Sequence, residues 1–432
     1  MFGLFDSVET KMRKTADNWL EVAGKVYHYR RDLLSDKERQ ELLSESDKLR
    51  TLLRDRADAS RLKLAVESIE VVLRKTGGTH YPKSGLVENV EFFLVAAIVI
   101  LGIRTYFVQP FKIPTNSMWP SYHGMTGEVY PSRDDEPGVL MKAFNFATVG
   151  AKPVRLDAPA SGEVLLPVGG VNRGVISYNE VKGRNWLVLP AQKRQYQIFV
   201  GDRLASVTVP LDFDFDWVAR DTFFPGDNRP FREIAFEMIE QGRYVDHQVN
   251  TADGTRRVRF LKTGKTVSAG DRLLSFDILT GDQLFVDRIS YHFVRPEVGD
   301  GFVFRTGQIK ELGGDQYYIK RLVGLPGDRI EIREPQLIRN GAPITGAKAF
   351  DFNNTRKDDF AGYFYGPDRG HPNAILRAGE TVTVPEHSYL ALGDNSGNSL
   401  DGRYWGFVPA ADVVGRPLFI YYPFTKRWGP AP

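Results

Sequence analysis

Residues 317–333 read YYIKRLVGLPGDRIEIR, and this stretch decides the fold class. Apolar side chains alternate with polar ones around a turn that contains a Gly-Asp pair, a pattern typical of β-strands. Alternate side chains of a strand share a face, so Lys320 is expected beside Tyr318 and Leu322. A lysine side chain on an apolar strand face is either buried or extends to solvent, and the sequence leaves both interpretations open.

A buried lysine would have chemical consequences. A free lysine has a pKa of about 10.4 and is protonated at neutral pH, so it cannot act as a base. Loss of solvation lowers that pKa. Bringing it to about 7 takes about 4 kcal/mol, which an apolar strand face could supply.

The pattern around this stretch extends over most of the chain. Helical periodicity fades after Pro120, and alternating runs follow with turn residues at intervals of about ten. A Gly-Asp pair introduces an apolar run five times, starting at positions 201, 270, 281, 299 and 327. The region from Tyr122 to the end is therefore predicted to be mainly β, as a barrel, a sandwich or both.

The N-terminal region is different. Met1–Leu20 has no apolar stretch of the kind found in secretory signals. Ser35 and Glu38 have the spacing of a capping box, and leucines then recur at helical intervals up to Gly77-Gly78. We expect a charged helical hairpin, either solvated on its outer face or used to dock a partner.

A short apolar run separates these two regions. Phe92–Ile103 reads FFLVAAIVILGI, without a charged residue. A membrane span needs about 20 residues, and Tyr106–Val108 lengthen the run if Arg104 reaches the interface. We interpret it as a single transmembrane helix. Basic residues are slightly more numerous before the run than after it, which favours a cytoplasmic N-terminus.

Composition excludes several classes of protein. The 432 residues have a net charge of +3, too balanced to indicate a nucleic-acid-binding protein. A mean hydropathy of −0.31 excludes a polytopic membrane protein. The chain contains no cysteine and so no disulfide or thiolate site. The seven histidines show no ligand spacing, so we expect no metal. We also expect no cofactor.

Two further segments are rich in polar side chains. PTNSMWP at 114–120 places hydroxyl groups between two prolines, where the backbone is stiff. GDNSGNSLDGRYWG at 393–406 is a dense polar loop in which Asp401 and Arg403 could pair and Ser399 could bond an amine. Each segment taken alone could also be an ordinary surface turn.

In this order, and with the apolar run upstream, these segments resemble the signature boxes of bacterial type I signal peptidases, which are membrane-bound Ser/Lys peptidases. The similar segments are IPTNSMWP at 113–120, GDQLFVDRISYHFVRPEVGDGFVF at 281–304, YIKRLVGLPGDRIEI at 318–332 and GDNSGNSLDGRYWGFVP at 393–409. The resemblance covers roughly residues 92–120, 281–333 and 386–416, about a quarter of the chain.

The resemblance implies roles for individual residues. Ser117 matches the nucleophile and Lys320 the general base. The backbone amide of Ser117 and the hydroxyl of Thr115 match the oxyanion hole, and Ser399 matches the residue that orients the lysine. A supporting ion pair is implied for Asp401 and Arg403 near Arg321. Small substrate pockets for an A-x-A cleavage site are implied for Ile113, Met118 and Ile319.

The chain departs from the family pattern in several places. Asn116 stands where the family usually has glycine, Ser396 replaces an arginine, and Gly402 replaces a serine. None of these changes removes the Ser/Lys pair. The largest departure is an insertion of about 160 residues between the nucleophile segment and Gly281.

The insertion has features of its own. Residues 157–164 and 263–273 resemble the opening and closing segments of lipoyl-like barrel-sandwich domains, but no modified-lysine hairpin lies between them. Residues 213–231, rich in aromatic and acidic side chains, are expected to form an exposed face. The insertion is either a β accessory domain or a binding domain with an unknown partner.

The resulting hypothesis is a mainly β protein with a signal-peptidase-type core, an inserted β domain of the lipoyl-like type, one transmembrane helix and an N-terminal helical hairpin. Its parts are a cytoplasmic helical region 1–88, a transmembrane helix 89–109, a catalytic core 110–120 and 281–432, and an insertion 121–280.

The implied function is removal of signal peptides from exported preproteins at the bacterial inner membrane, with the catalytic domain on the outer side. The implied partners are preprotein signal peptides and the lipid bilayer. The alternatives are a dedicated Ser/Lys maturation peptidase with a pilin-type substrate and a non-catalytic envelope scaffold of the same fold.

Overall fold

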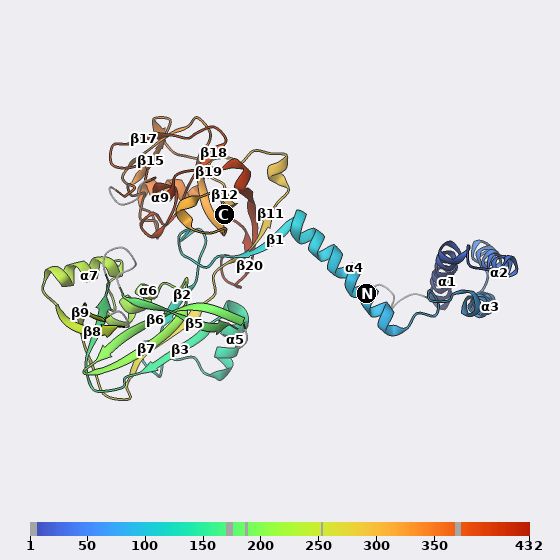
Figure 1. The fold of residues 1–432 in the computed structure, drawn as a ribbon, viewed down its shortest axis with the longest axis horizontal. Coiled ribbons are helices and arrows are strands. Elements are labelled where there is room, and N and C mark those ends of the chain that lie inside the picture. The colour runs from blue at the N-terminus through green and yellow to red at the C-terminus, as the bar shows by residue number, and fades with distance from the viewer. Residues whose placement is uncertain (1–6, 170–175, 186–188, 252–253, 368–372) are drawn as a thin grey trace. The chain divides into compact units, whose positions relative to one another are not determined.

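The chain forms two compact units, Met1–Leu101 and Gly102–Pro432. The computed structural model describes residues 7–169, 176–185, 189–251, 254–367 and 373–432 (Figure 1). Residues 1–6, which belong to the predicted cytoplasmic region, lie outside the described part.

The first unit contains packed helices. They are α1 (Val8–Arg30), α2 (Asp36–Arg54) and α3 (Ala59–Thr76). The predicted capping box is confirmed, because Ser35 and Glu38 each bond the other's backbone amide. The two predicted helices are also confirmed, but α1 packs on them, so the region is not a simple hairpin. Its buried face includes the small residues Ala16 and Ala23, which give a weak apolar stripe.

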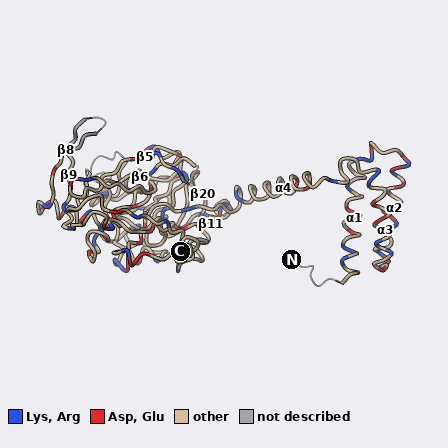
Figure 2. The backbone as a smooth tube through the Cα atoms, turned by 90° about the horizontal axis from the view of Figure 1, so that it is seen from below, with Lys and Arg blue, Asp and Glu red and all other residues tan. Residues whose placement is uncertain are grey.

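The apolar run lies in helix α4 (Gly85–Tyr106). This helix is long and apolar enough to cross a membrane, and none of its residues is buried. Figure 2 shows that charged residues are confined to its ends. The helix begins four residues before the predicted boundary at 89 and ends three residues before 109.

The predicted catalytic core is built on an antiparallel sheet. Its strands in spatial order are β1 (Val108–Lys112), β11 (Gln283–Asp287), β20 (Val413–Tyr422), β12 (Gly301–Arg305), β13 (Tyr317–Gly324), β18 (Ser388–Leu392) and β19 (Val408–Pro409), with β21 (Gly429–Pro430) beside β20. The β1 strand therefore follows directly on helix α4 and brings the nucleophile segment to this sheet.

A smaller antiparallel sheet completes the core. Its strands are β16 (Ala342–Pro343), β15 (Gln336–Arg339), β14 (Arg329–Arg333) and β17 (Thr381–Thr383). Both strands predicted from the opening stretch are therefore present, one in each sheet. The connecting helices are α8 (Lys348–Thr355) and α9 (Gly402–Trp405), with short 3₁₀ turns η1 (Ser290–His292), η2 (Lys310–Leu312), η3 (Ser396–Asn398) and η4 (Ala410–Asp412).

The insertion is also mainly β, as predicted. One sheet has the order β2 (Thr126–Val129), β10 (Arg272–Leu279), β3 (Lys152–Asp157). The other has the order β5 (Tyr178–Asn185), β6 (Leu189–Val200), β4 (Gly162–Val168), β9 (Gly254–Val267), β8 (Tyr244–Thr251), with β7 (Arg203–Pro210) beside β6. Its helices are α5 (Val139–Val149), α6 (Phe215–Phe223) and α7 (Phe231–Glu240).

The prediction that 213–231 forms an exposed face is wrong. Phe213, Phe215, Phe223 and Phe231 are buried in the core of the insertion. The segment forms α6 and the start of α7, and each helix turns its apolar stripe inward while its acidic residues stay at the edge.

The segments that resemble a lipoyl-like domain lie side by side. The amide of Ala158 donates to the carbonyl of Asp271 at 2.8 Å, and the amide of Gly270 donates to the carbonyl of Ala158 at 2.9 Å. Strands β2 and β10 also pair, with Thr126 opposite Leu279. The two ends of the insertion therefore meet. The lipoyl-like likeness itself stays a prediction.

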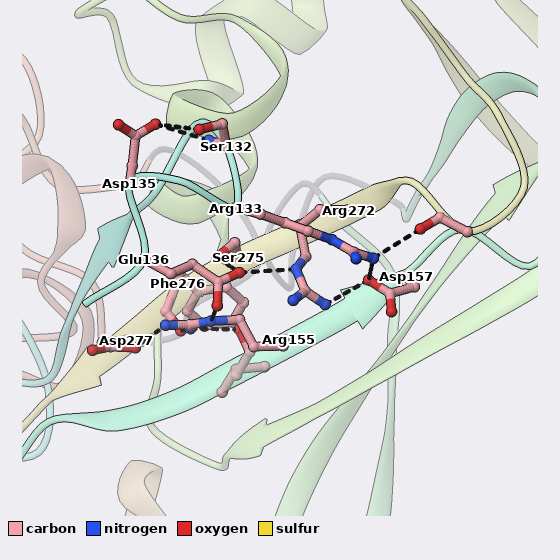
Figure 3. Close-up of polar contacts among 12 residues, drawn as sticks. Ser132, Arg133, Asp135, Glu136, Arg155, Asp157, Arg272, Ser275, Phe276 and Asp277 are labelled. Atoms are coloured by element: carbon pink, nitrogen blue, oxygen red, sulfur yellow. Dashed lines mark hydrogen bonds and ion pairs between the residues drawn. The ribbon is translucent and has the colours of Figure 1, made fainter. Parts of the chain in front are cut away.

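A cluster of charged side chains fixes the first sheet of the insertion (Figure 3). Arg155 lies between Glu136, at 3.0 Å, and Asp277, at 2.7 Å. Arg272 pairs with Glu136 at 2.9 Å and with Asp157 at 2.5 Å. These contacts tie the loop before α5 to strands β3 and β10, so each arginine of the cluster has carboxylate partners.

Candidate active site

The structure brings Ser117 and Lys320 together. Ser117 lies in the turn after β1, and Lys320 lies in the middle of β13. Lys320 Nζ donates a hydrogen bond of 2.7 Å to Ser117 Oγ. Both side chains are largely enclosed, with 4% of Lys320 and 9% of Ser117 exposed.

The surroundings of Lys320 favour the neutral amine. Burial lowers its pKa to about 8, although the charges of Asp401 and Asp394 act in the opposite direction. In the described part of the chain, no carboxylate lies within ion-pair distance of Nζ, whose other hydrogen-bond partner is the carbonyl of Ile319 at 3.1 Å. The side chain therefore does not reach solvent, and about a tenth of it would be neutral at pH 7.

Two buried ion pairs flank the lysine. Arg403 binds Asp401 through Nε and Nη2, each at 2.8 Å. Arg321 binds a different carboxylate, Asp394, at 2.6 and 3.1 Å. The resemblance placed Arg321 near the Asp401/Arg403 pair but did not single out Asp394. The Gly-Asp-Asn motif that begins at Gly393 was the available signal.

The polar loop after β18 fixes the nucleophile turn. The Asn395 amide donates to the carbonyl of Ser117 at 3.1 Å, and its Nδ2 donates to the carbonyl of Asn116 at 3.0 Å. Gly393 allows this approach, because a Cβ there would lie 2.1 Å from Ser399 Oγ and 2.5 Å from the Ser117 carbonyl oxygen. Asn395 thus holds the backbone of the turn that contains Ser117, a contact that was not predicted from the sequence.

Asn116, the departure from the family's glycine, has a structural explanation. Its Nδ2 donates to the carbonyl of Met125 at 3.0 Å. Its Oδ1 accepts from the amide of Gly124 at 2.9 Å. The side chain therefore ties the nucleophile turn to the first residues of the insertion.

Two other residues implied by the resemblance, Ser399 and Thr115, make no hydrogen bond to Ser117 or Lys320 among the contacts of the described residues. Ser399 is buried, but its Oγ has no hydrogen-bond partner among the described residues, so the structure does not show the expected bond to Lys320. Thr115 is exposed beside Ser117, where its hydroxyl is accessible. Ser396, which replaces the family's arginine, accepts a hydrogen bond of 2.7 Å at its Oγ from Arg403.

The residues implied for the substrate pockets share one apolar cluster. Ile113 and Met118 are buried in it, and Ile319 is half-buried against it. Met118 adjoins Ser117 along the chain, whereas Ile319 and Lys320 are neighbours in β13 and point to opposite faces of that strand. The role of Ile113, Met118 and Ile319 in substrate selection stays a prediction.

The insertion touches the site along one side. The rings of Trp119 and His123 lie 3.9 Å apart between centroids at a tilt of 39°, and Trp119 meets Trp217 of α6 edge-on at 5.1 Å. Asn398 Nδ2 donates to Asp214 Oδ2 at 3.2 Å. Burial, and then the charge of Arg427, lowers the pKa of His123 to about 3, so this histidine is neutral.

Within the described residues, no group of three or more His, Asp or Glu side chains is arranged to hold a metal ion. The contact of Ser117 with Lys320 places a hydroxyl beside an amine. A serine activated by an adjacent base is a nucleophile for acyl transfer.

Comparison with known proteins agrees with this geometry. Residues 274–422 match the family described as signal peptidase, peptidase S26. Signal peptidase I from Bacillus licheniformis is 31% identical over 150 residues, which cover 34% of this chain and 70% of that relative. The chain belongs to the signal peptidase I family.

Other relatives give a similar picture. The probable signal peptidase I-1 of Synechocystis sp. is 34% identical over 152 residues, covering 34% of this chain and 66% of that relative, just under two thirds of its length. A crystal structure of a signal peptidase I from Enterococcus faecalis is 30% identical, covers 28% of this chain and 97% of that chain, and has a TM-score of 0.22. The family match at 274–422 leaves most of the insertion outside it.

Proposed function

We propose that this member of the signal peptidase I family is a membrane-anchored serine endopeptidase that removes signal peptides from exported preproteins after small residues. One observation supports this above all others. A buried amine with a pKa of about 8 lies 2.7 Å from the hydroxyl of Ser117. Such an amine can accept the hydroxyl proton near neutral pH, which an ordinary lysine cannot do.

The proposed reaction is acyl transfer through Ser117. Neutral Lys320 takes the proton from Oγ as the oxygen attacks the scissile carbonyl. The backbone amide of Ser117 and the hydroxyl of Thr115 stabilise the oxyanion. The lysine ammonium then gives its proton to the leaving amine, and a water activated by the same lysine hydrolyses the acyl-enzyme.

The surroundings of the pair support the substrate class. Ile113, Met118 and Ile319 belong to one apolar cluster, and the proposal assigns them to pockets that accept small side chains and exclude large ones by overlap. Ser117 follows the last residue of α4 by eleven positions, a length of at most about 40 Å. If α4 spans the bacterial inner membrane with its N-terminus inside, the nucleophile lies outside and close to the bilayer, where a signal peptide would be presented.

Substitution of the reactive pair tests this function. Ser117→Ala and Lys320→Arg are each expected to lower kcat/KM for an A-x-A preprotein in detergent by at least about 10³-fold. The arginine keeps the positive charge but cannot act as a base. Lys265→Arg changes a half-buried lysine of the insertion whose pKa is also lowered by burial, and this control should keep full activity.

The pH profile supplies a second readout. Activity of the unaltered protein should rise with pH through an apparent pKa of about 8 as Lys320 loses its proton. Cleavage retained by Ser117→Ala or Lys320→Arg would overturn the proposal. A profile that rises only near the pKa of a free lysine would contradict the role of the buried amine.

A further inference from the structure

Helix α5 of the insertion exposes its apolar side chains. Val139 is 83% exposed and Leu140 88% exposed, and Met141, Phe144 and Phe146 are exposed as well. None of the helix residues is buried. A surface helix normally turns its apolar stripe toward a core, and contiguous exposed apolar surface marks an interaction site.

The sheet of the catalytic core holds α5 in place. The amide of Phe424 donates to the carbonyl of Thr148 at 2.9 Å, and the hydroxyl of Tyr422 lies 3.3 Å from the carbonyl oxygens of Phe146 and Ala147. Phe424 itself is exposed, and so is Trp428 on the turn that follows. We call these exposed residues the α5 patch: Val139, Leu140, Met141, Phe144, Phe146, Phe424 and Trp428.

Basic residues border the α5 patch. Lys142 lies within α5, and Lys426 lies between Phe424 and Trp428. Lys112 joins them through the register of the sheet, in which it lies opposite Gln283, and Gln283 lies opposite Tyr422. Partial burial and the nearby charge of Lys152 both lower the pKa of Lys112, which places these two lysines close together.

The acidic residues nearest to α5 along the chain precede it, and two of them already form hydrogen bonds or ion pairs with other residues. Asp135 accepts from the backbone and hydroxyl of Ser132, and Glu136 pairs with Arg155 and Arg272 (Figure 3). Asp134 remains exposed. Apolar and aromatic side chains bordered by lysines are typical of surfaces that enter the interface of an anionic bilayer.

The short link between α4 and the sheet also favours a bilayer as the partner of the α5 patch. Lys112, at the edge of the α5 patch, follows Tyr106, the last residue of α4, by six positions. Six extended residues span at most about 22 Å. A helix α4 that spans a bilayer would therefore keep this part of the sheet within reach of the lipid headgroups.

We propose that the α5 patch is an interfacial contact with an anionic phospholipid surface, made by the insertion. This inference rests on the membrane anchoring of the proposed function. The contact gives the catalytic unit a second attachment besides α4, and two attachments restrict its rotation over the membrane. The insertion thereby fixes the height of Ser117 above the lipid.

Fluorescent labelling of the full-length protein tests the contact. The chain contains no cysteine, so Leu140→Cys gives a single site for an environment-sensitive dye. Phe236→Cys, at an exposed apolar residue of α7 in the same insertion, is the matched control. Both residues are exposed, so neither change removes core packing. Each labelled protein is reconstituted into vesicles of phosphatidylethanolamine and phosphatidylglycerol, with and without bromine on the acyl chains.

The label at position 140 is expected to emit at shorter wavelength than the label at 236 and to lose intensity with brominated lipid, whereas the label at 236 does not. Equal quenching at the two positions, or none at either, would overturn the inference. Energy transfer between differently labelled copies without lipid quenching would also overturn it, because the occupant would be a second copy. Neither readout requires cleavage. A protein that contacts lipid but does not cleave preproteins would therefore contradict the proposed function and leave this inference standing.

Discussion

The two parts of the Gly102–Pro432 unit pair their charged side chains in different ways. In the insertion, Arg155 and Arg272 share the carboxylates of Glu136, Asp277 and Asp157 (Figure 3). In the catalytic core, Arg321 and Arg403 are paired in the same manner, but among the described residues Lys320 Nζ has only a hydroxyl and a carbonyl as hydrogen-bond partners.

Charged groups that have a carboxylate partner differ in their consequences from an amine that has none. A buried charge with a carboxylate partner holds loops together and keeps its ordinary protonation state. Burial of an amine without such a partner lowers its pKa at a cost in stability, and such a cost is typical of a functional group. Under the proposed function, charged residues therefore stabilise one region and take part in the reaction in the other.

The largest stability effect should come from breaking a pair in the core. Asp394→Asn leaves the buried guanidinium of Arg321 without its carboxylate, and we expect unfolding to become about 3–5 kcal/mol easier. Glu136→Gln in the insertion should cost less, about 1.5–3 kcal/mol, because Arg155 and Arg272 keep Asp277 and Asp157.

Urea unfolding of the two variants measures this difference. Activity of the folded fraction adds a second distinction. Asp394→Asn should lower it, because the neighbouring Asn395 positions the nucleophile turn, while Glu136→Gln should leave it unchanged. Equal losses of stability and activity in both variants would show that the two clusters do not differ in the way described.

The next effect concerns the lysine itself. Lys320→Met removes an amine whose pKa falls from 10.5 to about 8 on folding, equivalent to about 3 kcal/mol. Between these pH values the unfolded chain binds more protons than the folded one, so stability of the unaltered protein rises with pH. The variant should be more stable by about 3 kcal/mol below pH 8, and its advantage should vanish above pH 10.5.

Thermal or urea unfolding across this pH range gives the comparison directly. Other titrating groups are common to both proteins and cancel in the difference. A constant difference at every pH would mean that burial does not lower the pKa of Lys320.

The smallest effect should come where the two regions touch. Trp217→Ala removes the edge-on contact with Trp119, which is two residues from the nucleophile. Aromatic pairs contribute about 0.5–1.5 kcal/mol, so we expect a two- to tenfold loss of kcat/KM, about the rate equivalent of that energy. Phe236→Ala, at an exposed position of α7, is the control. An unchanged rate for Trp217→Ala would confine the insertion to roles away from the site.

Sequence reasoning predicted what depends on local pattern. Alternation around Lys320 gave strand β13, and the Ser35–Glu38 spacing gave the start of α2. It missed α1, whose buried positions include Ala16 and Ala23, because small residues contribute little to an apolar stripe. It misplaced 213–231 because aromatic residues separated by acids suggested a surface, whereas each helix turns one face inward.

The site was less predictable where partners are distant along the chain. The pairing of Arg321 with Asp394 and the hydrogen bonds of Asn395 to the nucleophile turn cross large separations in sequence. Hydrophobic periodicity in the sequence does not predict such contacts, since they depend on which strands become neighbours in the sheet. The roles of Thr115 and Ser399 remain predictions for the same reason.

The meeting of the insertion's two ends has a consequence for how the protein folds. Ser117 and Lys320 are 203 positions apart, so the reactive pair forms only after a long loop has closed. Closing a flexible loop of about 150 residues costs about 4 kcal/mol in chain entropy. Because Thr126 and Leu279 are neighbours once the insertion has folded, that closure accompanies formation of the insertion's own core. The catalytic sheet then assembles as if the insertion were a short turn.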